Sequence, residues 1–226
     1  MPNHTYTSKS ERQAPGFKAA KDCVTVLFCG NVAGHLIKMG LLYRAANPRA
    51  LKGKNKNLLP VFWQSNKKAW VTAALFLDWF HKCFIPEVKQ YLEEKGLDFK
   101  VLLIIDNVPG HPAALQFAHT NVEIVFLPPN TTSILQPLDQ GMIRCFKATY
   151  MRLTFSWIRS AMDADPNLNM MECWKSFNIA DDITYVKQEM DAIKPETVNA
   201  CWRTLWKECV NDLKGFPTID KEVKRK

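Results

Sequence analysis

The sequence predicts an α/β fold, in which helices cover a mixed sheet of at least four strands. The first observation is a near-continuous apolar run over residues 99–106, which is typical of a strand buried on both faces. The second is a β-branched and apolar run over residues 23–29. The third is the helical spacing of apolar side chains over residues 70–94 and again after residue 137.

The composition fits one globular domain and argues against membrane and secreted classes. The chain has 226 residues, of which 47% are hydrophobic, so it can bury a proper core. Its longest apolar runs, such as residues 101–105, are far shorter than the roughly 20 residues of a membrane helix. The start of the chain is polar, and the seven cysteines include no CxxC pair. We therefore expect no membrane partner, no secretory signal and no disulfide framework or zinc site.

The N-terminal third is predicted to contain a hairpin and a long basic loop. Residues 1–20 are polar and expected to be irregular, with a turn at Pro15-Gly16. Residues 23–29 form the first strand, and residues 35–44 form a second strand after a glycine-containing turn. Residues 47–68 are predicted to form a loop, because they are rich in lysine and contain two prolines.

A long helix follows over residues 70–94. Thr72 is a candidate N-cap, and Gly96 is a typical C-terminal stop. Pro86 lies inside the helical pattern, where its missing N–H group predicts a kink or a break.

Two buried strands and a second long helix come next. The strands cover residues 99–106 and 122–127, with a short helix over residues 112–118 between them. Pro137 is expected to open the long helix. Its apolar side contains Leu138, Met142, Phe146, Tyr150 and Leu153, and its basic side contains Arg144, Lys147, Arg152 and Arg159.

The remainder of the chain is predicted to be helical up to about residue 213. A loop over residues 163–169 precedes these helices, and residues 221–226 form a charged tail. The tryptophans of the chain lie at spacings typical of core positions, so we expect core packing rather than base stacking. The expected anchors in this segment are Trp174, Phe177, Trp202 and Trp206.

The positive charge is concentrated in the first third of the chain. The formal net charge is +8, yet residues 1–70 hold twelve of the 30 Lys and Arg residues and only two acids, Glu11 and Asp22. Seven cations lie between residues 44 and 68 without any acid: Arg44, Arg49, Lys52, Lys54, Lys56, Lys67 and Lys68. Such a segment either attracts a polyanion such as nucleic acid or is a solvated loop kept soluble by lysines.

Two carboxylates are placed where a cation could bind. Asp106 ends the most apolar strand, and ligands of α/β sheets gather at the carboxyl ends of strands. Asp139 follows after a helix–strand–loop connection that can return it to Asp106. Two converging carboxylates suit Mg²⁺. The alternatives are a turn-forming Asp-Asn pair at residue 106 and an acid that favours a helix dipole at residue 139.

Polar residues beside these acids have two interpretations each. His111 either contacts a phosphate or metal-bound water, or starts a helix with its ring satisfied. Asn130, Thr131 and Gln136 either contact a DNA backbone or brace their loop, and bracing is favoured.

The segments around the acids resemble a known family. Residues 103–112 read LIIDNVPGHP, and residues 126–141 read FLPPNTTSILQPLDQG. These blocks resemble the catalytic domain of Tigger/pogo-type transposases and their host-adopted relatives, the DDE-1 superfamily. Shorter matches are APGFKAAKD at 14–22, NPRALK at 47–52 and NKKAW at 66–70. The resemblance covers nearly the whole chain.

The resemblance implies an RNase H-like fold that cuts and joins DNA with two Mg²⁺ ions held by three acids. Asp106 matches the second acid and Asp139 the third. The first acid belongs to a central first strand that has no match in this sequence. The resemblance further implies a truncated catalytic-type domain over residues 1–160 and a C-terminal helical segment over residues 161–226. Sheet edges that the missing strand would pair are then open, which permits self-association.

Asp22 is a poor candidate for the first acid by this comparison. A first-strand acid should precede two further strands before the long helix, and only two strands are predicted after Asp22, matching the family's second and third. Asp22 also lies in the lead-in to the strand over residues 23–29.

The expected function is DNA or other nucleic-acid binding by a nuclear domain whose catalytic triad is incomplete. The cations of residues 44–68 and of the long helix would carry the binding, and Mg²⁺ would bind weakly or not at all. One alternative is an active Mg²⁺-dependent endonuclease or transposase, with a third acid from Asp22, Glu11 or a missing exon. Another is a transposon remnant without function.

Overall fold

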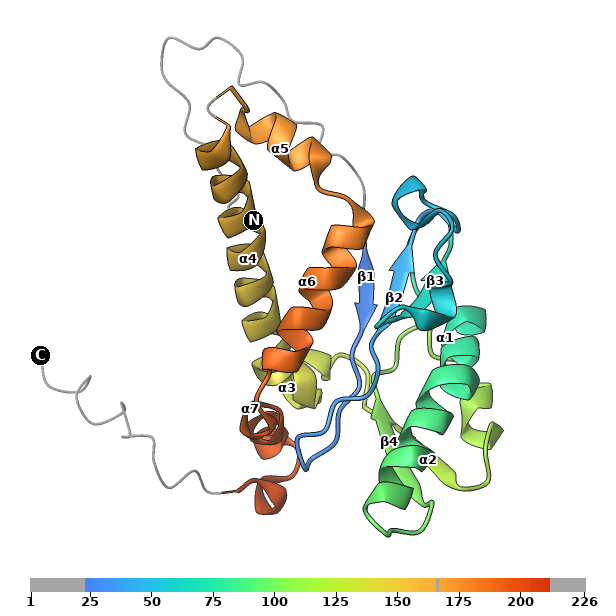
Figure 1. Ribbon diagram of the computed structural model, residues 1–226. Helices are drawn as coiled ribbons and strands as arrows, with labels where there is room; N and C mark the ends of the chain where they lie inside the picture. Colours follow the sequence, from blue (N-terminus) through green and yellow to red (C-terminus); the bar gives the residue numbers. More distant parts are fainter. Residues whose placement is uncertain (1–22, 166, 212–226) are drawn as a thin grey trace, which may run out of the picture.

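The computed structural model describes residues 23–165 and 167–211, which fold into a mixed α/β structure with two small sheets and several helices (Figure 1). The predicted turn at Pro15-Gly16, the acids Glu11 and Asp22 and the charged tail 221–226 lie outside the described residues. Within the described ranges, no helix has the length and apolarity that a membrane span requires.

The first sheet has the strand order β1-β2-β3. Strand β1 (Thr25–Leu27) pairs antiparallel with β2 (Gly40–Tyr43), which confirms the predicted hairpin. Strand β3 (Phe62–Ser65) pairs parallel with β2 and lies inside the predicted basic loop, so the loop prediction was wrong there. The apolar run at residues 58–63 contains Pro60, which argues against a strand. Pairing with β2 nevertheless stabilises residues 62–65 as a strand.

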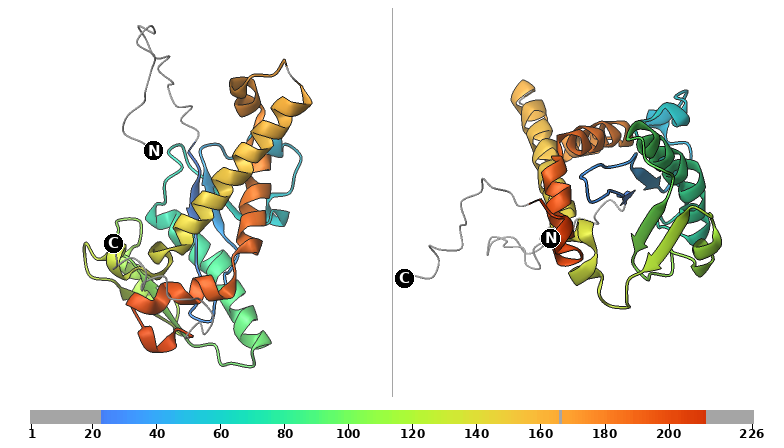
Figure 2. Two further views of the ribbon diagram at one scale, coloured as in Figure 1. Left: turned by 90° about the vertical axis from the view of Figure 1, so that its left-hand side faces the viewer. Right: turned by 90° about the horizontal axis from the view of Figure 1, so that it is seen from below.

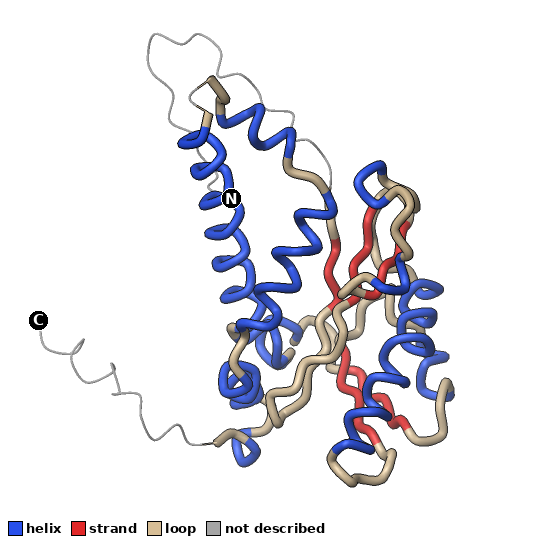
Figure 3. Tube along the Cα trace, viewed as in Figure 1, coloured by secondary structure: helices blue, strands red, loops and turns tan. Residues whose placement is uncertain are grey.

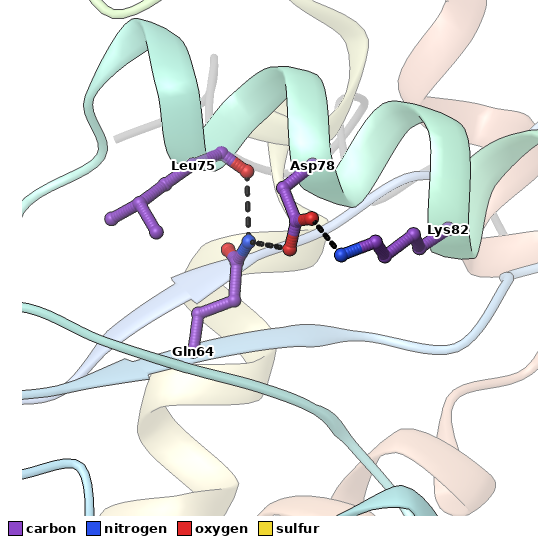
Figure 4. Close-up of polar contacts among 4 residues, drawn as sticks. All are labelled: Gln64, Leu75, Asp78 and Lys82. Carbon is purple, nitrogen blue, oxygen red and sulfur yellow. Dashed lines mark hydrogen bonds and ion pairs between the residues drawn. The ribbon is translucent and has the colours of Figure 1, made fainter.

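A buried glutamine ties β3 to helix α1 (Ala73–Trp79). Gln64, only 5% exposed, donates from Nε2 to the Leu75 carbonyl at 2.8 Å and to Asp78 Oδ2 at 3.1 Å (Figure 4). Lys82 pairs with the other oxygen of Asp78 at 2.5 Å. These contacts satisfy the amide nitrogen of Gln64, whereas its Oε1 is buried without a partner among the described residues.

The second sheet contains β4 (Val101–Ile105) and β5 (Val122–Phe126), which pair in parallel. The described strands therefore form two sheets. The prediction of one sheet with at least four strands was wrong. The prediction that the β4 segment is buried on both faces was also wrong, because Leu103 and Ile105 are buried whereas Leu102 is 53% exposed. One face of this sheet packs on helices, and the other faces a cavity described below.

Helix α1 continues through a π-helical turn at residues 80–84 into α2 (Ile85–Glu94) (Figure 3). Pro86 lies in the first turn of α2, so the predicted interruption is confirmed. The Thr72 side chain caps α1 and Gly96 has a φ of 65°, which confirms both predicted ends. The buried face of these helices packs against β4 and β5 through Phe76, Trp79 and Phe80.

Five further helices complete the described chain: α3 (Thr132–Leu135), α4 (Met142–Ala164), α5 (Met170–Ser176), α6 (Ile179–Ala192) and α7 (Pro195–Ala200). Strands β1 and β2 lie between α4 and α6 on one side and α1 and α2 on the other (Figures 1 and 2). A core of Met39 and Leu41 from the sheet side and Phe146 and Ile183 from the helices fills the first of these interfaces.

The long helix begins later than predicted. Residues Pro137–Gln140 form a 3-10 turn, Gly141 has a φ of 145°, and α4 starts at Met142. A side chain at position 141 would be strained in this conformation, so glycine permits the change of direction. Asp139 therefore lies in a turn before the helix and not in its first turn.

Two of the expected aromatic anchors are not in the core. Trp174 is 44% exposed and Trp206 is 50% exposed, so the prediction of core packing was wrong for both. The C-terminal helices bury small side chains instead, such as Val198 and Cys201. Helical spacing alone did not identify which face of these short helices meets the body of the protein.

Candidate functional site

Asp106 lies directly after β4, at the carboxyl end of the strand. The last ladder bond, from Leu127 N to Ile105 O at 2.8 Å, fixes the backbone just before it. The Asp106 side chain is 15% exposed, and its Oδ1 lies 2.9 Å from His111 Nδ1. The same nitrogen lies 3.0 Å from the Asp106 carbonyl oxygen, so one ring atom contacts both groups of this residue.

His111 is itself fixed by its surroundings. Its backbone N–H donates to the Val108 carbonyl at 2.9 Å, and its ring packs against Phe76 of α1 with centroids 4.2 Å apart. The side chain is 11% exposed. These contacts satisfy the ring, and they hold the Asp106 carboxylate in one orientation.

Asp139 lies within electrostatic range of Asp106. Partial burial raises the pKa of the Asp139 carboxyl, the negative charge of Asp106 raises it further, and Lys147 acts in the opposite direction. The Asp139 carboxylate has no hydrogen bond or ion pair with the described residues. The connection from β4 thus brings the two acids close enough to interact, one held by a histidine and one free.

The loop between the two acids is braced by its own hydrogen bonds. Thr131 Oγ1 donates to the Pro128 carbonyl at 2.7 Å, and Asn130 has a φ of 63°. Gln140 Nε2 donates to the Ser133 carbonyl at 2.9 Å. The bracing interpretation is confirmed for Thr131, whereas Gln136 Oε1 is buried and has no partner among the described residues.

Cations from separate segments meet Asp139 at one cavity. This cavity, of about 920 Å³, lies between β1, α4 and α6. Arg49 of the basic loop and Lys147 of α4 line it together with Asp139. Lys175 of α5 lines it too, although it was not singled out in the sequence, because a lone lysine on a short helix gives no signal.

The remaining predicted basic residues are spread over the surface. Lys56 is half-buried and donates from Nζ to Asn47 Oδ1. Arg159 pairs with Asp163 at 3.7 Å on the exposed side of α4. The other predicted cations are exposed: Arg44, Lys52, Lys54, Lys67, Lys68, Arg144 and Arg152.

A second basic segment lies beside Asp106. Lys67 and Lys68 belong to a turn that leads through Trp70 into Val71. The Val71 carbonyl oxygen lies 3.2 Å from where a Cβ on Gly110 would be, so this turn abuts the loop after Asp106. Trp70 is 68% exposed, so the expectation of core packing was wrong for it. Its place after two lysines in a polar turn, outside any helix, was the signal that could have identified it.

A further cavity, of about 760 Å³, separates the two sheets. Residues 26–32 of the β1 segment line one side, and residues 100–106 of the β4 segment line the other. Trp79 and Trp202 also line it, and neither indole N–H has a hydrogen-bond partner among the described residues. Both strands are at the edge of their sheet, so two edges without a described partner strand face the same apolar space.

The donor set at Asp106 and Asp139 suits a hard divalent cation. Two carboxylates, one of them free of other partners, match the preference of Mg²⁺ for a few carboxylates and several waters. The part of the chain that the structure describes contains no cluster of three or more His, Cys, Asp or Glu side chains that could hold a metal ion.

Comparisons with known proteins point to a single family. The family model described as "DDE superfamily endonuclease" matches residues 21–202. The human Jerky protein homolog is 37% identical over 140 residues, which are 61% of this chain and 25% of that protein. The human Tigger transposable element-derived protein 7 is 31% identical over 157 residues, which are 66% of this chain and 28% of that protein.

A more distant relative is ARS-binding protein 1 of Schizosaccharomyces pombe, 26% identical over 175 residues, which are 72% of this chain and 30% of that protein. The chain thus spans about a quarter to a third of the length of these relatives. No solved structure matches the chain significantly.

Proposed function

Because this chain belongs to the DDE superfamily endonuclease family, we propose that it is a transposon-derived, DNA-binding domain whose set of catalytic acids is incomplete. The observation that carries this proposal is the arrangement of cations around the paired acids. Arg49 and Lys147 line a cavity with Asp139, and the turn holding Lys67 and Lys68 abuts the loop after Asp106. A DNA strand that crosses the acids would meet cations on both sides.

Binding would be electrostatic and weakly dependent on sequence. Each cation that contacts a phosphate releases counterions, so affinity should fall steeply as salt rises. The exposed cations of residues 44–68 and of α4 are the contact residues in this proposal. ARS-binding protein 1 carries a binding function in its name, which supports a nucleic-acid partner and a nuclear location for this chain as well.

Asp106 and Asp139 are the residues that would hold Mg²⁺. A bound Mg²⁺ would stabilise negative charge on a phosphate oxygen. His111 would keep the Asp106 carboxylate in place, and Lys147 would hold a phosphate near Asp139. Two ions about 4 Å apart need more ligands than two carboxylates supply, which is why we propose an incomplete catalytic set.

We propose that the fold is RNase H-like and lacks its central first strand. The support is the apolar cavity between β1 and β4, which is lined by the edges that such a strand would pair. Open edges of this kind also permit self-association. In this proposal residues 1–160 form the truncated catalytic-type domain, and residues 161–226 form its C-terminal helical segment.

An active Mg²⁺-dependent endonuclease is the second candidate, and one observation favours it. Strand β3 makes three strands, not two, between Asp22 and helix α1. The strand count that argued against Asp22 as the first acid was therefore wrong. Asp22 itself lies outside the described residues, as does Glu11, and the third acid could also come from a segment beyond this sequence.

A plasmid assay separates these candidates. The purified chain is mixed with supercoiled plasmid and Mg²⁺ or Mn²⁺, and nicking and binding are measured in the same samples. Variants are Asp106→Asn, Asp139→Asn and Asp22→Asn, with Asp191→Asn as a control for an exposed acid paired with Lys187 on α6.

The proposal predicts binding that weakens with salt, no nicking and similar binding by all four variants. Nicking that requires the metal, Asp106 and Asp139 would overturn the proposal that the set of catalytic acids is incomplete. Loss of that nicking in Asp22→Asn would identify Asp22 as the third acid. A folded chain that does not bind plasmid at low salt would indicate a remnant without function.

A further inference from the structure

We propose that Trp70 stacks on an unpaired nucleobase beside Asp106. This inference rests on the proposed nucleic-acid binding and adds a substrate class to it, namely single-stranded or locally opened DNA. Trp70 is 68% exposed, whereas Trp79 of the adjacent helix α1 is 3% exposed. Trp70 is the most exposed tryptophan of the described residues, ahead of Trp206 at 50% and Trp174 at 44%, and it shares its turn with two lysines.

The backbone around Trp70 is held in a fixed turn. The Asn66 side chain accepts hydrogen bonds through Oδ1 from the backbone N–H of Lys68 and of Trp70, each at 3.1 Å. Its Nδ2 donates back to the Trp70 carbonyl at 2.5 Å. Ala69 N donates to the Asn66 carbonyl at 2.9 Å, which closes the same turn. The hydrogen bonds of one asparagine thus reach three consecutive residues, 68–70.

Ala69 adds a second sign of a built feature. Its φ of 52° lies in the left-handed region, which alanine rarely adopts, and its side chain is 1% exposed. Burial of the methyl group and the Asn66 bonds together hold this strained conformation. Strain of this kind is retained where the surrounding structure imposes it, often at functional sites. Here its effect is to turn the Trp70 side chain outward.

The position of the turn places the indole in the same cavity as Asp106. Trp70, Asp106 and His111 all line the cavity between the sheets. Val71, the next residue, has its carbonyl oxygen against Gly110, one residue before His111. A nucleotide stacked on Trp70 would therefore lie at the entrance to the acidic site.

The neighbouring cations complete a nucleotide-binding arrangement. Lys67 and Lys68 are exposed and belong to the same turn as Trp70. Nonspecific single-strand binders combine a basic track for phosphates with aromatic rings for bases. In an intact duplex each base already has both faces stacked, so an isolated indole gains most from an unpaired base. This chemistry predicts tolerance of base identity and preference for single strands.

The test compares single-stranded and duplex DNA. We would measure the Kd of the full chain for a fluorescent thymidine oligonucleotide and for a duplex of equal length, each over a range of salt concentrations. A length of about 20 nucleotides is longer than the usual binding site of one single-strand-binding domain. Variants are Trp70→Ala and Trp70→Phe, and Phe117→Ala is the control, because Phe117 is an exposed aromatic residue, 90% exposed, that lines neither of the two cavities.

We expect Trp70→Ala to weaken single-strand binding by about 5- to 150-fold. Its salt slope should stay that of the wild type, because no cation is lost. Duplex binding should change by less than about 2-fold, Trp70→Phe should recover most of the single-strand affinity, and Phe117→Ala should behave as the wild type. DNA should also quench the part of the tryptophan fluorescence that Trp70→Phe removes, which decides the matter if Trp70→Ala does not fold.

Two results would overturn the stacking role: equal single-strand affinity of Trp70→Ala and the wild type, or absence of that quenching on binding. Wild-type binding that depends on salt but not on Trp70 would leave the proposed DNA binding intact and reject this inference alone. Failure of the wild type to bind either DNA at low salt would reject the proposed function itself.

Discussion

The negative charge of Asp106 raises the pKa of Asp139, although 32 residues separate them in the chain. The short parallel pairing of β4 with β5 and the braced loop after β5 bring them together. Repulsion between two carboxylates is unfavourable unless a cation or a proton relieves it. The pair is therefore the feature of this protein that most directly reports on metal binding.

Replacement of Asp139 should change how stability depends on pH. The raised pKa means that the native state binds this proton more tightly than the unfolded state, whose value is near 3.8. The stabilisation that this tighter proton binding gives to the native state is fully present below pH 3.8 and is lost as pH rises through the native pKa. Asp139→Asn should then be more stable than the wild type at pH 7, and the difference should vanish below pH 3.8.

Urea unfolding of both proteins between about pH 3 and pH 7 measures this difference, within the range where carboxylates titrate. Asp191→Asn, which removes an acid paired with Lys187, serves as the control and should show no such gain at pH 7. A difference between Asp139→Asn and the wild type that does not vary with pH would contradict the charge coupling.

Mg²⁺ should stabilise the folded chain through the same two acids. A ligand that binds only the native state raises the unfolding free energy, by about 2.7 kcal/mol at 100 times its Kd, and so raises the unfolding temperature. Because the proposed site binds Mg²⁺ weakly, we expect a shift for the wild type only at Mg²⁺ concentrations well above its Kd, and none in Asp106→Asn and Asp139→Asn. Thermal unfolding monitored by circular dichroism, with and without Mg²⁺ at neutral pH, measures it. An equal shift in all three proteins would place the ion elsewhere.

The hydrogen bond from Tyr150 to Asp182 links helices α4 and α6. Burial raises the pKa of the Asp182 carboxyl, and its Oδ2 has no partner among the described residues. Tyr150→Phe leaves the buried carboxylate without this donor and should cost about 1–3 kcal/mol of unfolding free energy. Tyr185→Phe is the matched control, since the Tyr185 hydroxyl makes no hydrogen bond with any described residue, and it should cost less than about 0.5 kcal/mol. Chemical unfolding at pH 7 compares them, and equal costs would contradict the proposed link.

Gly34 connects the β1–β2 hairpin to helix α7. Its φ is 91°, and a Cβ at this position would lie 2.4 Å from the Pro195 carbonyl oxygen. Gly34→Ala should therefore lose stability through both strain and a clash with the backbone. Gly53 is the control, because its φ is 75° and no atom lies within 4 Å of an added Cβ. Gly53→Ala therefore measures the backbone strain alone, which should cost about 1–2 kcal/mol of unfolding free energy. Urea unfolding should show a distinctly larger cost for Gly34→Ala than for Gly53→Ala, and equal costs would contradict the contact.

The open edge of β4 should be visible in amide hydrogen exchange. Val101 N donates to Asn121 O across the ladder. Because successive amides of a strand point in opposite directions, those of Leu103 and Ile105 also point to β5. The amides of Leu102 and Ile104 point to the cavity instead. The Leu102 and Ile104 amides should exchange faster than those of Leu103 and Ile105. Exchange measured by NMR checks this, and slow exchange at Leu102 and Ile104 would mean that another segment already pairs this edge.

The elements that the sequence predicted well have local causes. The hairpin of β1 and β2, the cap at Thr72 and the stop at Gly96 each depend on residues within a few positions. The division into two sheets, strand β3 and the outward position of Trp70 were not predicted. Each of these depends on a partner far along the chain or on a single backbone angle, which no periodicity records.

Sequence by itself determined the family, the basic first third of the chain and the two acids at positions 106 and 139. Those features are composition and short motifs, which are independent of distant contacts. Only the tertiary structure decided which groups act together: His111 on Asp106, Lys147 on Asp139, and Trp70 in one cavity with Asp106. The reason is that Coulomb interactions, hydrogen bonds and burial depend on distances through space, and those distances are set by the packing of β4, α1 and α4 around the site.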